Sequence, residues 1–259
     1  MRARELAQAA ARWTAVGTAA AVTLYAAYVS VAWLRYGRVL SSRSETRDAL
    51  LDGFMPTYEI REHHDIRVGA PADLTLAVAR HLDVLDLPVV RVLVKGRELI
   101  IGATPDRQPR PHALVAEMQS IGWGVLADVP DREIVMGAVT RPWDANVVFR
   151  AVPPGEFASF HDPGYVKIVW TLRADPIDGG HSIFSTETRA IATDQIARSK
   201  FRTYWSFLSP GIILIRMAAV RAVRTEGERQ VREGLRPPLR AAATDSYGPA
   251  PAGPPAVST

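Results

Sequence analysis

The sequence predicts an α+β fold, with an antiparallel β-sheet wrapped around a long C-terminal helix and one transmembrane helix ahead of them. Three observations predict it. Residues 13–34 carry no charge, residues 123–192 read as strands joined by short turns, and the periodicity changes from two to about 3.6 after residue 194. Strands and helices that alternate irregularly before a final helix are typical of an α+β protein.

The N-terminal stretch from Trp13 to Leu34 is long enough to cross a hydrocarbon core about 30 Å thick as a helix. Trp13 and Trp33 stand near its two ends, where aromatic rings favour the membrane interface. Two alternatives stay open: a soluble helix, and a cleaved signal peptide with Ser30 and Ala32 before the cleavage point. A helix that is apolar all round and longer than a usual signal region favours the anchor.

Arginines flank this stretch on both sides: Arg2, Arg4 and Arg12 before it, and Arg35, Arg38, Arg43 and Arg47 after it. The excess after the span favours a cytoplasmic C-terminal domain. We therefore expect a single-pass membrane protein with four parts. Residues 1–36 form a basic segment and anchor, 37–56 a juxtamembrane linker, 57–233 the folded domain, and 234–259 a disordered tail rich in Pro and Ala.

The folded domain is expected to begin with a strand over 58–68, because apolar and charged residues alternate there. Pro71 stands where a helix would start, and Leu74, Val78 and Leu82 give that helix an apolar side. A further helical segment is predicted at 112–121. The strands predicted after it, each bounded by Pro, Asp or Gly turns, are 123–128, 133–140, 146–151, 156–160, 165–174 and 181–192.

The last strand has one covered face and one wet face. Phe184, Thr186, Thr188 and Ala190 share the first, and the residues between them share the second. On the wet face, Glu187 and Arg189 are expected to form exposed cross-strand pairs.

The final helix is expected to begin after the capping pair Thr193-Asp194. Its polar side contains Arg198, Lys200 and Arg202. Pro210 should kink or break it. An apolar side recurs every three or four residues, at Ala197, Phe201, Tyr204, Trp205 and Leu208.

The run STETRAIATDQIARSKFRTYWSFLSPGIILIR, from Ser185 to Arg216, resembles the end of the SRPBCC superfamily, the START-like or polyketide cyclase-dehydratase-like proteins with a helix-grip fold. The order of elements from Thr57 to Arg224 is similar as well. The resemblance implies a cavity for a hydrophobic ligand between the sheet and the C-terminal helix. The residues expected to line it are Trp143, Phe149, Trp170, Phe184, Thr186, Thr188, Phe201, Tyr204, Trp205 and Leu208.

Other chemistries have weaker support. The chain has no Cys, which removes thiol catalysis and thiolate metal sites. His63 and His64 are adjacent on a strand and point to opposite faces, so they cannot readily chelate one ion, and no metal or cofactor is expected. His161-Asp162 lies in a turn without a nucleophile elbow. The net charge of +4 comes with no basic stripe interleaved with aromatics, so nucleic acid is not expected as a partner.

The uncharged span and the resemblance together imply membrane-anchored binding of a hydrophobic small molecule or lipid, with a lipid-like or polyketide-like structure. One alternative is an aromatase/cyclase or dehydratase in the same cavity, for which His64 and Arg141 are the only candidate groups, and no catalytic residue is assigned. Another is a structural or interaction module whose core is filled, since a packed core and a pocket use the same residue types. The sequence leaves ligand identity, pathway and oligomeric state open.

Overall fold

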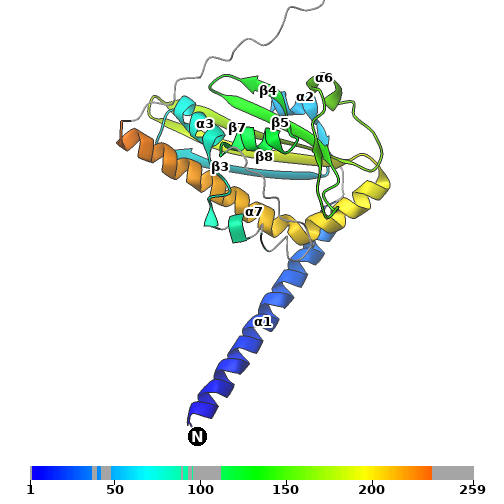
Figure 1. Cartoon of the computed structure of the whole chain (residues 1–259), viewed down its shortest axis with the longest axis vertical. Coiled ribbons are helices and arrows are strands. Elements are labelled where there is room, and N and C mark those ends of the chain that lie inside the picture. Colours follow the sequence, from blue (N-terminus) through cyan, green and yellow to red (C-terminus); the bar gives the residue numbers. More distant parts are fainter. Residues whose placement is uncertain are drawn as a thin grey trace, which may run out of the picture.

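The computed structural model describes residues 2–36, 40–41, 48–88, 90–92, 95 and 112–234. It confirms an α+β protein with an antiparallel sheet and a long C-terminal helix (Figure 1). In order, its elements are α1 (Arg2–Arg35), β1 (Leu40–Ser41), α2 (Ala49–Phe54), β2 (Thr57–Tyr58), β3 (Ile60–Val68), α3 (Ala72–His81), α5 (Leu114–Ser120), β4 (Gly124–Val129), β5 (Glu133–Thr140), β6 (Phe149–Arg150), α6 (Pro154–Phe157), β7 (Val166–Asp178), β8 (His181–Ala192) and α7 (Gln195–Arg232).

The main sheet has the strand order β3-β8-β7-β5-β4, with β6 paired to β5, and all of these pairs are antiparallel. The strands predicted over 133–140 and 181–192 coincide with β5 and β8. Register places Thr188 opposite Glu62 on one side and Trp170 on the other. Every second side chain on each strand therefore points to the same side, and together these side chains form a continuous inner face of the sheet.

The region between β5 and β7 differs from the prediction in one place. The strand predicted over 156–160 is wrong: Pro154–Phe157 is a short helix. Proline suits the first turn of a helix because its missing N–H would have no partner there, which favoured the helix over a strand. Phe157 from this helix is fully buried.

Helix α7 begins where the capping pair predicts, with the Asp194 carboxylate accepting from the backbone N–H groups of Ile196 and Ala197 at 2.8 Å. It runs through Pro210 without ending, and Figure 1 shows that it changes direction near its middle. Its second half lies across the inner face of the sheet beside α3. The core between them includes Leu74, Val220 and Val223.

The outer face of the sheet is also covered. Helix α2 packs there, and Leu51 and Met55 are buried against Val135, Val139 and Val169. Asp48 caps α2 through Leu50 and Leu51. The predicted linker over 37–56 therefore ends earlier than expected, because residues 48–55 already belong to the folded body. An amphipathic helix of this length has too few turns for its periodicity to be recognised in sequence.

The expected exposed pairing of Glu187 and Arg189 is also wrong. Arg189 is 0% and Glu187 6% exposed, because α2 and the segment after it close over this face. Arg189 Nε donates to Glu187 Oε1 at 2.7 Å, and Arg189 Nη1 donates to Asp52 and to the Met55 carbonyl. Burial raises the pKa of Glu187, but hydrogen bonds from His63, Arg61 and Arg189 outweigh it and lower the pKa to about 2.

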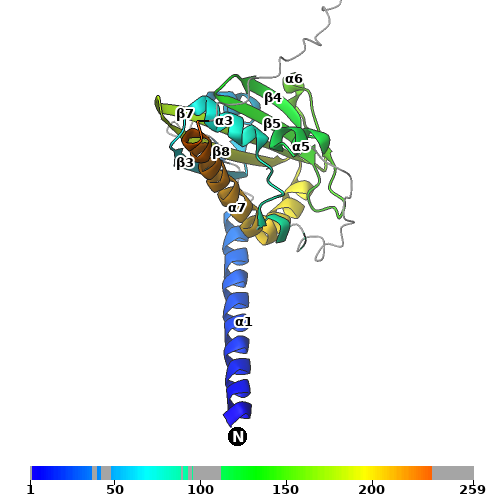
Figure 2. The same cartoon turned by 60° about the vertical axis from the view of Figure 1, so that its left-hand side comes forward.

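Helix α1 projects away from the folded body, and only its C-terminal end packs against it (Figures 1 and 2). Ala32 and Tyr36 are buried against Phe201 and Trp205 of α7. The Tyr36 hydroxyl donates to Glu62 Oε1 at 2.8 Å.

Arg202, expected on the polar side of α7, instead contacts α1. Its guanidinium lies 3.7 Å from the centre of the Trp33 ring and donates to the Trp33 carbonyl. Tyr28 and Ser209 share a further hydrogen bond of 3.0 Å between the two helices. The end of α1 is therefore held on the first half of α7 by aromatic packing and by polar contacts.

Among the described residues, two helices are long and apolar enough to cross a membrane by length and composition: Arg12–Arg35 and α7. Because α7 packs on the sheet, we assign it to the folded body. The predicted disordered tail, apart from Gly234, lies outside the described residues.

Candidate functional site

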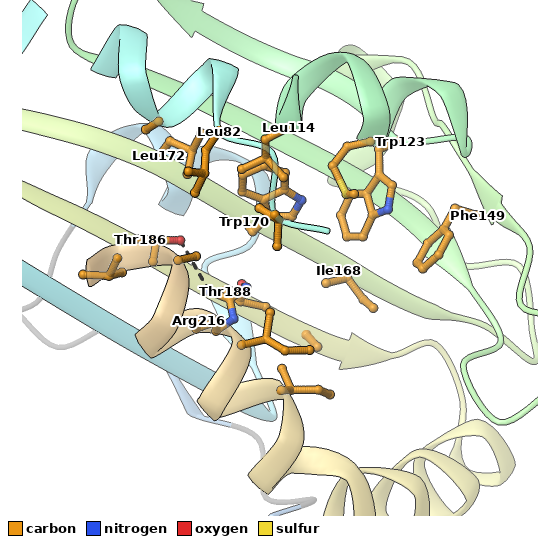
Figure 3. Close-up of a pocket in the computed structure, with 18 of the residues that line it drawn as sticks. Leu82, Leu114, Trp123, Phe149, Ile168, Trp170, Leu172, Thr186, Thr188 and Arg216 are labelled. Atoms are coloured by element: carbon orange, nitrogen blue, oxygen red, sulfur yellow. Dashed lines mark hydrogen bonds between the residues drawn. The ribbon is translucent and has the colours of Figure 1, made fainter. Parts of the chain in front are cut away.

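A cavity of about 440 Å³ lies between the inner face of the sheet and α7. Its walls come from β7 and β8, from both halves of α7, and from α3, α5 and the β5–β6 connection. Apolar side chains make up most of the lining, as Figure 3 shows for its upper wall. The helix and the sheet thus enclose an open space as well as a packed core.

Eight of the ten predicted residues line this cavity: Phe149, Trp170, Phe184, Thr186, Thr188, Phe201, Tyr204 and Trp205. The period of two in β8 and the helical period in α7 bring six of them together, and Phe149 and Trp170 come from β6 and β7. Whether they bind a ligand stays a prediction.

Trp143 and Leu208 do not line the cavity. Trp143 follows β5 and packs against the cluster of Phe201 and Trp205, with Lys200 Nζ 5.7 Å from the centre of its ring. Leu208 is half-buried just before the bend at Pro210. Beyond the bend, Ile212 and Ile215 contribute to the wall in its place.

Aromatic rings form the wall next to β6. The Trp123 ring centre lies 5.1 Å from that of Phe149 and 6.2 Å from that of Trp170. Trp123 immediately precedes β4, and Trp170 faces inward from β7, so the three rings meet across the sheet (Figure 3). They offer a large apolar surface that loses little conformational entropy on contact with a ligand.

Sequence reasoning missed several lining residues. Leu82, Leu114 and Met118 come from the α3 and α5 regions, whose placement over the sheet depends on tertiary contacts. Arg216 was missed as well, although a signal existed. It follows Ile212 by four residues and precedes Val220 by four, so it is a lone cation on the apolar stripe of α7.

Arg216 gives the cavity its main polar feature (Figure 3). Nη1 donates to Thr186 Oγ1 at 3.4 Å, and Nη2 donates to Thr188 Oγ1. Burial lowers the pKa of the Arg216 guanidinium to about 10, against the attraction of the Glu62 carboxylate. The group stays charged at neutral pH in surroundings that solvate it poorly.

The neighbouring strand β3 places Glu62 and His64 beside this spot, opposite Thr188 and Thr186. Nε2 of His64 is buried and has no hydrogen-bond partner among the described residues. Burial, and then the charge of Arg216, lower the pKa of His64. His63 points to the opposite face, as predicted, where it contacts Glu187.

The other candidates from the sequence lie away from the cavity. Arg141 donates to the Gly164 carbonyl at 3.1 Å and lies over the Tyr165 ring. Asp162, next to His161, pairs with Arg150 at 3.2 Å on the surface. These residues tie loops together at the edge of the sheet.

No protein-family model matches the chain, and no curated protein matches it. Solved structures with a similar arrangement include the ZhuI aromatase/cyclase from Streptomyces sp. R1128, with 15% identity, a TM-score of 0.26, and coverage of 68% of this chain and 97% of that one. A conserved protein from Geobacillus kaustophilus has 11% identity, a TM-score of 0.32, and coverage of 66% and 97%.

The hypothetical protein jhp0584 from Helicobacter pylori has 6% identity, a TM-score of 0.36, and coverage of 73% and 99%. At such low identities and TM-scores, these similarities carry no information about the ligand or chemistry of this chain. The function of this chain is therefore inferred from its cavity.

Proposed function

We propose that this protein is a membrane-anchored domain that binds a hydrophobic small molecule, lipid-like or polyketide-like, in the cavity between its sheet and α7. The observation that carries the proposal is the cavity itself, about 440 Å³ with an almost wholly apolar lining. Small-molecule sites usually have volumes of about 300–1,000 Å³ and a few placed polar groups. A filled core would leave no space of this size, since natural interiors pack with few voids larger than a water molecule.

The composition of the walls supports a hydrophobic ligand. Aromatic rings on one side and Ile212 and Ile215 on the other would remove apolar ligand surface from water. This burial contributes a binding free energy of about 25 cal/mol for each Å² of apolar surface. Thr186 and Thr188 are small and leave space beside the sheet, and Arg216 holds their hydroxyls.

The membrane part of the proposal is supported by α1. Between Arg12 and Arg35 the helix is apolar, and Trp13, Leu24 and Leu34 are exposed. Exposed Phe207 and Leu214 flank the bend of α7, close to where α1 joins the body. Exposed apolar surface that continues from a candidate span onto the folded body suits a bilayer surface. We place the domain on the cytoplasmic side, from the arginine excess after the span.

Native mass spectrometry of full-length protein released from nanodiscs tests the proposal, with organic extraction to identify any bound molecule. Ala219 lines the cavity, so Ala219→Phe should fill part of it and remove the bound species. Ala218→Phe is the matched control, because it makes the same change at the preceding residue of α7, which does not line the cavity.

A bound hydrophobic molecule that is present in wild type and Ala218→Phe, and lost in Ala219→Phe, is the expected result. Equal occupancy in both variants, or no molecule in any of the three proteins, would contradict it. The aromatase/cyclase or dehydratase alternative stays a prediction, and a cyclised product in the extract would favour it.

A further inference from the structure

The cavity contains a charge that its apolar walls do not explain. Arg216 is half-buried on α7, and its hydrogen bonds go to two neutral hydroxyls, those of Thr186 and Thr188. Among the described residues, no carboxylate forms an ion pair with it. Removing a cation from water costs several kcal/mol unless charge or hydrogen bonds compensate, so the position calls for an anion.

The carboxylate whose charge attracts Arg216, that of Glu62, already accepts a hydrogen bond from another residue. It accepts the Tyr36 hydroxyl at 2.8 Å, and this bond joins β3 to the end of α1. Glu62 thus attracts Arg216 through its charge and accepts none of the N–H donors of the guanidinium. A guanidinium has five N–H donors in a planar fork, and only two are used by the threonines.

The surroundings also have unused capacity for a hydrogen bond. The buried Nε2 of His64, on the strand next to Thr186, has no hydrogen-bond partner among the described residues. His64 does not line the cavity, so a charged group of a ligand at Arg216 would lie beside the two threonines. The two threonine hydroxyls can rotate to donate toward the same point, since each has one O–H and two acceptor lone pairs.

We propose that Arg216, presented by Thr186 and Thr188, binds the anionic end of the ligand, so that the cavity takes an amphiphile with one apolar body and a carboxylate or phosphate group. Planar bidentate pairing with either oxyanion is the interaction for which a guanidinium is best suited. The volume of about 440 Å³ is in the lower part of the range for small-molecule sites and favours a single chain or ring system. This inference rests on the proposed function, because it concerns the same cavity.

The test compares ligands of one shape and different charge. Oleate, oleyl phosphate and the neutral methyl oleate are titrated against the full-length protein in nanodiscs, in competition with a fluorescent fatty acid. The same titrations are made with Arg216→Met, which keeps length and apolar bulk but removes the charge. Arg221→Met is the matched control, because Arg221 is an exposed arginine five residues further along α7.

Wild type and Arg221→Met should bind at least one of the two anions at least tenfold more tightly than methyl oleate. In Arg216→Met this preference should fall to less than twofold, while methyl oleate binds at least as well as before. Oleate and oleyl phosphate distinguish a carboxylate from a phosphate source. Arg216→Lys keeps the charge without the planar fork and should retain part of the preference. This variant also shows whether a loss in Arg216→Met reflects the missing charge or misfolding.

If methyl oleate and the anions bind wild type equally, the inference about Arg216 is wrong, although hydrophobic binding in the cavity stands. A preference for anions that survives in Arg216→Met would overturn it too. If none of the three compounds competes, both this inference and the proposed function are contradicted.

Discussion

Charged residues inside this protein differ in how their charge is compensated. Arg189 is fully buried but surrounded by Glu187, Asp52 and the Met55 carbonyl. Arg216 has only hydroxyl partners at hydrogen-bond distance. In the first arrangement two carboxylates compensate the charge, although Nη2 of Arg189 has no hydrogen-bond partner among the described residues, and the network stabilises the packing of α2 on the sheet. The charge of Arg216 has no ion-pair partner among the described residues, which is why we assign it an anionic ligand.

Arg189→Met should destabilise the protein by about 3–5 kcal/mol, because it removes a fully buried cation from beside Asp52 and Glu187, of which Glu187 keeps Arg61 and His63. Thermal and urea unfolding of the full-length protein in detergent would measure the loss. Arg67→Ala, at an exposed position on β3, is the control and should change stability by less than about 0.5 kcal/mol. Similar losses for both variants would contradict the role given to this network.

Glu133 provides a pH-dependent test at the same scale. Its side chain is 3% exposed, and burial, followed by the nearby Asp48, raises its pKa from 4.5 to about 8. The folded protein therefore binds this proton more tightly than the unfolded chain does. The stability that the proton contributes is complete below about pH 4.5 and is lost as the pH rises toward 8.

Glu133→Gln keeps the shape and removes the titration. Relative to wild type it should gain stability between pH 5 and pH 8, by up to about 1.4 kcal/mol for each pH unit. Unfolding midpoints of both proteins, measured across this range in one detergent, would show the difference. A constant difference between the two proteins at every pH would mean that Glu133 ionises normally in the fold.

At the scale of elements, the two halves of α7, before and after Pro210, make different contacts. Its first half holds the end of α1 through Trp205 and Arg202, its second half covers the sheet, and both halves line the cavity. Proline removes a backbone hydrogen bond but does not end the helix, because both halves are packed on other elements.

Truncation of the inward rings of α7 tests this arrangement. Phe201→Ala and Trp205→Ala remove buried side chains, for which core substitutions cost about 3–5 kcal/mol. We expect about 3 kcal/mol, at the low end, because both rings also border the cavity, together with weaker binding of a fluorescent fatty acid.

Thr203→Ala, on the exposed side of the same turn, should leave both stability and binding within error of wild type. Unfolding and binding are measured on the same preparations of the three variants. If the Thr203 variant were the most damaged, the assigned orientation of α7 would be wrong.

At the scale of the molecule, a long exposed helix carries a compact body at one end (Figure 2). The contact between them includes Tyr36, which packs edge-on to Trp205 with ring centres 5.9 Å apart. Because Phe201 and Trp205 both contact the end of α1 and line the cavity, α1 and the cavity share a wall.

The anchor is tested by fractionation of cells that express the full-length protein. Wild type should sediment with membranes and resist an alkaline carbonate wash. Ala20→Arg combined with Val22→Arg should release it, since each arginine in the middle of a span costs about 2.5–3.5 kcal/mol.

The control is Ala20→Leu with Val22→Leu, which should stay in the membrane. Both positions are exposed and precede the docked end of α1, so neither change touches the folded body. Recovery of unprocessed wild type in the soluble fraction, or an intact mass showing cleavage near Ala32, would contradict the anchor.

Local sequence pattern was sufficient to predict several elements of this protein. The uncharged stretch of α1, the bounds of β8 and the start of α7 at Asp194 all depend on neighbours in sequence, and periodicity and capping chemistry report such neighbours directly. The periods of β8 and α7 also predicted six of the residues that line the cavity.

Tertiary structure decided which faces are covered. Glu187 and Arg189 alternate as exposed strand residues do, but α2, more than 130 residues earlier, buries them. Arg216 repeats with the apolar stripe of α7, but only the closeness of β8 makes it part of a polar site in the cavity. Contacts between segments far apart in the chain leave no local period, so folding alone determines whether a charge meets water, a partner or a cavity.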